Sequence, residues 1–66
     1  INHNDRIALE RGDKLEQLAK NATEEQMVKF GPEARLVIDQ IKIFKPERAA
    51  EIEVAWNSRE QELGIE

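Results

Sequence analysis

Apolar residues recur at helical spacing along most of the chain, and capping and stop signals divide the chain into four segments. The first segment runs from Asp5 to Asn21. One helical face, at spacing i, i+3, i+4, i+7, is formed by Leu15, Leu18, Ala19 and Ala22. Gly12 interrupts this segment, and Asp13 three residues before Glu16 resembles a capping box, at which a helix begins. The pattern therefore fits either one helix or two.

The second segment is short and is bounded by strong signals on both sides. Thr23 followed by Gln26 is a capping-box pattern, and it opens a helix over Glu24–Phe30. Gly31 and Pro32 then end this helix and begin the next one, because proline is well suited to the first helical position. We therefore predict a separate short helix here.

The third segment, Glu33–Phe44, is the most apolar part of the chain. As a helix it carries two apolar faces. The first comprises Ala34, Val37, Ile38, Ile41 and Phe44, and the second comprises Leu36 and Ile43. A helix with so little polar surface is expected at the centre of a bundle, where neighbours cover it on two sides.

A strand is the alternative for part of this third segment. Residues 40–43 alternate between polar and branched apolar side chains, and they could pair with residues 51–56, which alternate as well. The helix is favoured because Pro32 provides a helix start and the segment is about twelve residues long.

The fourth segment begins with Lys45-Pro46-Glu47, again a proline-first start, and Gly64 provides the C-terminal stop. Its apolar face consists of Ala49, Ile52, Trp56 and Leu63. Together the four segments predict an all-α fold. We expect a single helical domain over residues 1–66, built as a small three- to four-helix bundle with the Glu33–Phe44 helix central.

Length and composition limit the classes of function. A chain of 66 residues buries only about 60% of its unfolded surface, so its core is thin. This chain has no cysteine for a disulfide that could stabilise it. A protein partner or a second copy would bury additional apolar surface. The net charge is −4 and the cations are scattered, which makes a nucleic-acid partner unlikely on charge grounds. No apolar run approaches the ~20 residues that cross a bilayer, so we expect no membrane partner. Zero cysteine fits a cytoplasmic protein.

Candidate chemical groups are few. His3 is the only histidine, and with Asp5 it would make a poor two-ligand metal site. Ser58 is the only serine and has no histidine near it in sequence. Neighbouring glutamates such as Glu51 and Glu53 point apart on a helix. We therefore predict no enzyme, no catalytic, cofactor or metal site, and no small-molecule substrate.

A non-enzymatic protein–protein interaction or oligomerisation module is the leading hypothesis, as an accessory or regulatory domain of a larger assembly such as a phage or plasmid complex. The apolar surplus lies on the third and fourth segments. Trp56 in the fourth segment is the only tryptophan, and aromatic residues of this kind often anchor the centre of an interface. The residues expected to carry the interaction are Leu36, Ile43, Ile52, Trp56 and Leu63.

The alternative is a small helix-turn-helix domain that binds DNA or regulates transcription. Glu24–Phe30 and Glu33–Phe44 would be its two helices, with the turn at Gly31 and Pro32. The second helix of such a motif must turn polar and basic side chains toward the major groove. The candidates for this role are only Arg35, Gln40 and Lys42.

Overall fold

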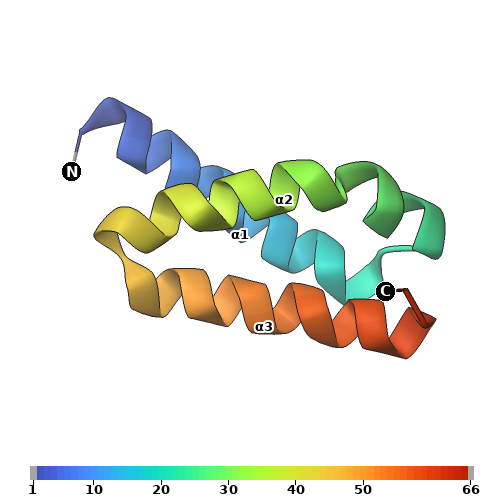
Figure 1. Ribbon diagram of the computed structural model, residues 1–66. Coiled ribbons are helices and arrows are strands. Elements are labelled where there is room, and N and C mark those ends of the chain that lie inside the picture. The colour runs from blue at the N-terminus through green and yellow to red at the C-terminus, as the bar shows by residue number, and fades with distance from the viewer. Residues whose placement is uncertain (1, 66) are drawn as a thin grey trace.

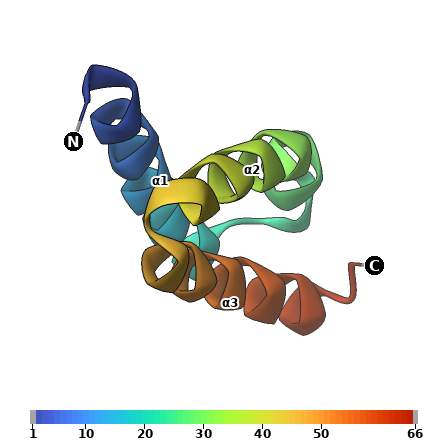
Figure 2. The same ribbon diagram turned by 60° about the vertical axis from the view of Figure 1, so that its left-hand side comes forward.

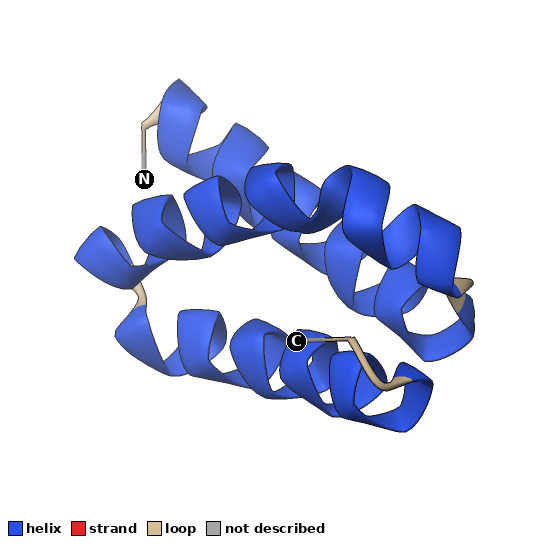
Figure 3. Ribbon diagram, turned by 45° about the vertical axis from the view of Figure 1, so that its right-hand side comes forward, coloured by secondary structure: helices blue, strands red, loops and turns tan. Residues whose placement is uncertain are grey.

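The computed structural model describes residues 2–65 and shows an up-down-up bundle of three helices. The helices are α1 (His3–Asn21), α2 (Glu24–Phe44) and α3 (Pro46–Leu63). The connections between them are short, so consecutive helices lie antiparallel, and the C-terminal ends of α1 and α3 lie at the same end of the bundle (Figure 1). Within residues 2–65 every regular element is a helix (Figure 3). The all-α prediction is confirmed, and the strand alternative for residues 40–43 is wrong.

Helix α1 is one continuous helix that begins two residues earlier than predicted. The Asn2 side chain caps it by accepting a hydrogen bond of 2.8 Å from the Asp5 amide. Gly12 lies inside the helix and is buried. A Cβ at this position would lie 2.6 Å from Cδ1 of Ile41 and 2.7 Å from Cδ1 of Ile52. At Gly12, therefore, the backbone of α1 lies close against side chains of both other helices.

Helix α2 begins as predicted. The Thr23 hydroxyl accepts from the Gln26 amide at 3.2 Å, and the Gln26 side chain accepts from the Thr23 amide at 3.0 Å. These two bonds make a complete capping box.

The predicted break at Gly31 and Pro32 is wrong, because α2 continues through both residues to Phe44. Glycine lacks the Cβ that would clash with the following proline ring, so the helical conformation is accessible before Pro32. Met27 and Ala34, seven residues apart on either side of the proline, are both buried in the core. Burial on both sides of the proline keeps the helix intact and outweighs the local stop signals.

Helix α3 begins and ends as the sequence predicts. Pro46 is its first residue. Gly64 adopts a left-handed conformation with φ of 73°, and its amide donates to the Gln61 carbonyl at 3.2 Å. The Ile65 amide donates to the Glu60 carbonyl at 2.8 Å, so the helix closes with a Schellman motif.

The core lies where the three helices meet, and each helix contacts both others. Figure 2 shows the same three helices from a second direction, with the side that is on the left in Figure 1 brought forward. The core residues are Ala8, Leu15, Ala19, Ala22, Met27, Ala34, Val37, Ile38, Ile41, Ala49, Ile52 and Trp56. No helix of this bundle is enclosed by the other two. The prediction that Glu33–Phe44 is covered on two sides is therefore wrong, since Leu36 and Ile43 are exposed to solvent.

Candidate protein-interaction surface

The five residues predicted to carry an interaction fall into two groups. Ile52 and Trp56 are buried inside the chain, and Leu63 packs against the core from its edge. These three complete the contact of α3 with its own bundle, so they present little or no surface to a partner. Leu36 and Ile43 lie outside the core and remain available.

Leu36 and Ile43 form the centre of an apolar stripe on the side of α2 that faces away from the core. Their exposed fractions are 70% and 86%, and a separation of seven residues places them on one line along the helix. Val28, which is 60% exposed, extends the line toward the start of the helix, and the exposed Pro32 lies between Val28 and Leu36. We call these four residues the α2 outer face.

Val28 was missed as a candidate because the sequence pattern was divided at Pro32. Two separate helices have no fixed register relative to one another, so the alignment of Val28 with Leu36 was hidden. In the continuous helix the two are eight residues apart and share one side. The signal that could have found Val28 is therefore the apolar spacing counted straight through the proline.

Charged side chains flank the α2 outer face, and their signs differ between its two halves. The first half exposes three carboxylates and one amine, on Glu24, Glu25, Glu33 and Lys29. The second half, with the residue after it, exposes three cations and one carboxylate, on Arg35, Lys42, Lys45 and Asp39. The surface is thus acidic at one end and basic at the other.

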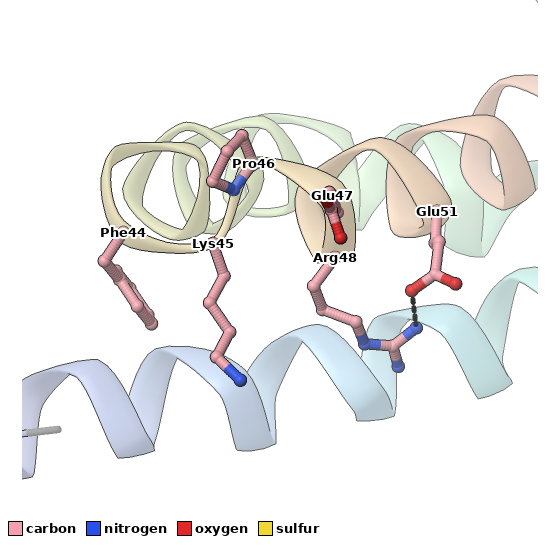
Figure 4. A pocket seen from close by; sticks show the side chains of 6 residues that line it. All are labelled: Phe44, Lys45, Pro46, Glu47, Arg48 and Glu51. Atoms are coloured by element: carbon pink, nitrogen blue, oxygen red, sulfur yellow. Dashed lines mark hydrogen bonds and ion pairs between the residues drawn. The ribbon is translucent and has the colours of Figure 1, made fainter.

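Arg48, near the start of α3, joins this helix to the interior of α1. Its guanidinium donates to both carboxylate oxygens of Glu16, at 2.9 and 3.1 Å, and to Asp13 at 2.5 Å. A further bond of 3.3 Å runs to Glu51 on its own helix, as Figure 4 shows. The hydrogen bonds from Arg48 lower the pKa of Glu16, and the same bonds raise the pKa of Arg48. Both terminal nitrogens of Arg48 bond to carboxylates, and the bonds to Glu16 and Asp13 hold α1 and α3 together.

Arg59 joins the same two helices near the C-terminal end of each. Its Nε and one terminal nitrogen donate to the Ala22 carbonyl at 2.9 and 2.7 Å. Ala22 is the C-cap residue that follows α1, so a cation on α3 satisfies a carbonyl at the negative end of the α1 dipole. The other terminal nitrogen bonds to Glu62 at 3.0 Å. Nothing in the local sequence around Arg59 indicates this contact, because its partner lies 37 residues away.

One hollow on the surface is lined mostly by charged side chains, where α2 ends and α3 begins. This hollow, shown in Figure 4, has a volume of about 510 Å³, opens to solvent, and is lined by residues 44–48 and Glu51. Its charged groups include Arg48, which is already held by carboxylates. No three side chains among His, Cys, Asp and Glu gather as metal ligands within residues 2–65.

None of the three helices in the described part of the chain combines the length and the apolar character that a membrane span requires. Comparison with known protein families, curated proteins and solved structures found no match to this chain.

Proposed function

We propose that this chain is a non-enzymatic interaction module that binds a partner protein by helix packing through the α2 outer face. The observation that carries the proposal is the alignment of Leu36 and Ile43, largely exposed, on a helix whose opposite side already fills the core. A small helical domain that binds through such a face serves as an accessory or regulatory part of a larger assembly. Its cysteine-free composition fits a cytoplasmic setting.

Single exposed aliphatic residues are ordinary on protein surfaces, so the alignment matters more than the exposure. Residues at i, i+4, i+8 and i+15 of a helix present one continuous strip, which is the form that helix-in-groove and helix-pair recognition use. Full burial of an aliphatic side chain contributes roughly 1.5–3 kcal/mol. Covering Leu36 and Ile43 would therefore drive association of this short chain, whose core is limited by its length.

The helix-turn-helix alternative loses its basis once α2 is continuous, because the turn at Gly31 and Pro32 does not exist. Two of the chain's arginines, Arg48 and Arg59, are occupied by contacts within the bundle. The interaction module is the function that the geometry favours.

A photo-crosslinking amino acid at Ile43 tests the proposal in the native host. We expect adducts at Ile43 that disappear when Leu36→Glu is added, because a carboxylate in the middle of the strip opposes its burial. The matched control places the same crosslinker at Gln17, an exposed position on α1. Circular dichroism of each variant verifies that the bundle is folded. Adducts at Ile43 no more abundant than those at Gln17 would overturn the proposal.

A further inference from the structure

We propose that the partner is a second copy of this chain, and that the two α2 helices pair antiparallel across a twofold axis near Leu36. This inference rests on the proposed function and adds the identity and the orientation of the partner. It follows from the order of apolar and charged residues along the α2 outer face.

The apolar positions are nearly symmetric about Leu36. Val28 precedes it by eight residues and Ile43 follows it by seven, which are distances of about 12 and about 10.5 Å along a helix. An antiparallel twofold pair centred near Leu36 therefore places each Val28 opposite the partner's Ile43, and the two Leu36 side chains meet at the axis. A twofold interface uses the same patch on both subunits, so one self-complementary strip is sufficient.

Charge determines the orientation. In an antiparallel pair the acidic first half of one α2, containing Glu24 and Glu25, lies along the basic second half of the other, containing Lys42 and Lys45. A parallel pair would align acidic with acidic and basic with basic, which is unfavourable. The dipoles of two antiparallel helices are also opposed, so their unlike ends lie together.

The size of the surface predicts a weak dimer. A stable interface buries about 800 Å² per partner, and four side chains along one helix supply only part of that area. The long stems of Lys29 and Arg35, which flank the strip, would add apolar contact while their charges stay in water. We therefore expect a dissociation constant on the order of 100 μM. Elsewhere on the bundle, Val54 on α3 is the remaining large exposed aliphatic residue of the described chain, and it stands alone.

Cysteine crosslinking tests the orientation of the two helices directly. The natural chain contains no cysteine, so any crosslink must involve the cysteine that is introduced. Under mild oxidation we expect Leu36→Cys to form a covalent dimer with itself. We expect an equal mixture of Val28→Cys and Ile43→Cys to form mixed dimers at least about tenfold faster than either variant crosslinks alone, since the distant pairs cannot reach one another. Val54→Cys is the matched control on α3, and it should form little or no covalent dimer.

Sedimentation equilibrium of the cysteine-free chain accompanies this test. We expect a monomer–dimer equilibrium whose dissociation constant rises by about tenfold or more in Leu36→Glu, because the twofold axis would place two carboxylates opposite each other. Self-crosslinking of Ile43→Cys that is faster than the mixed reaction overturns the antiparallel orientation.

A natural chain that stays monomeric at millimolar concentration overturns self-association. In that case, Leu36-dependent adducts of Ile43 with other proteins would leave the proposed function standing, and their absence would overturn both.

Discussion

Helix α1 turns small residues toward the core and polar residues toward solvent, whereas α2 carries aliphatic side chains on both sides. The buried residues of α1 are Ala8, Gly12, Leu15 and Ala19, of which three are small, and no large aliphatic residue of α1 is exposed. In α2 the core side includes Ile41, but the outer face includes Leu36 and Ile43.

The contrast shows which of the two helices has its apolar surface buried within the chain. The small residues of α1 let the isoleucines of α2 and α3 approach its backbone. Arg48 of α3 bonds to Glu16 inside α1, and Arg59 bonds to the Ala22 carbonyl at its C-terminal end. Helix α2 has one ion pair to α3, between Arg35 and Glu60 at 3.7 Å, and the arginine of this pair is mostly exposed. The apolar surface of α1 is thus buried inside the bundle, whereas that of α2 is buried on one side only.

The largest effect is expected from removing a buried isoleucine from α2. Ile41→Ala should lower the free energy of unfolding by about 3–4 kcal/mol, because the lost methyl groups leave a cavity where Gly12 and Ile52 meet. Ile43→Ala, two residues later on the outer face, is the matched control and should change the free energy by less than about 0.5 kcal/mol in dilute solution. Urea unfolding followed by the fluorescence of Trp56, the only tryptophan, measures both. Equal losses from the two variants would remove the distinction between the faces of α2.

Gly12→Val tests the close packing of α1. Its branched side chain would collide with Ile41 and Ile52, both of which are fully buried, so their side chains would have to shift within the core. We expect a loss of about 2–3 kcal/mol in the free energy of unfolding. Gln17→Val, on the exposed side of the same helix, should cost less than about 0.7 kcal/mol and controls for the lower helix propensity of valine. If Gly12→Val were as stable as its control, the close approach of the helices would be refuted.

Pro32→Ala should stabilise the protein. Pro32 is exposed inside a continuous helix, so alanine restores a backbone amide and removes the steric conflict of the proline ring with the preceding turn. Part of this gain is offset because proline also restricts the unfolded chain. The net increase in the free energy of unfolding should be about 1–2 kcal/mol, measured by the same urea titration. A decrease would mean that the proline ring makes a contact on which α2 depends.

The smallest effect concerns the ion pair between α1 and α3. Arg48→Met keeps the aliphatic stem but removes the bonds to Glu16, and it should cost about 1 kcal/mol at pH 7, because both groups are partly exposed.

This loss should depend on pH. The pKa of Glu16 is lowered in the folded state from its ordinary value of 4.5, so the pair stabilises the protein above that value and loses this contribution as the pH falls below it. The free energies of unfolding of the natural chain and Arg48→Met should therefore converge in acid. A difference that is constant from neutral pH through this acid range would show that Glu16 does not respond to Arg48.

Local patterns in the sequence predicted much of the core. The spacing of Ala34, Val37, Ile38 and Ile41 identified the buried side of α2, and the caps at Thr23, Pro46 and Gly64 located three helix ends. These features depend on residues within about two helical turns of each other, and such relations are visible in a sequence.

Features that depend on distant residues could not be predicted in the same way. Gly31 and Pro32 signal a break locally, and only the burial of Met27 and Ala34 against other helices explains why none occurs. Likewise, helical spacing placed Trp56 on the apolar face of its helix. It could not show whether this face is covered by the other two helices, as the structure has it, or by another molecule. The candidate surface was therefore predicted in part, through Leu36 and Ile43. Val28 could be assigned to it only once α2 was known to continue through Pro32.

Methyl NMR across a concentration series tests the central claim most directly. As the chain is concentrated from about 10 μM to about 1 mM, a range that spans a dissociation constant on the order of 100 μM, we predict that the methyl signals of Leu36, Ile43 and Val28 shift together along one binding curve. The signals of Val54, equally open to solvent on α3, should stay fixed. Shifts at Val54 without shifts at Leu36 and Ile43, or no shift at any of these methyl groups, would contradict the account.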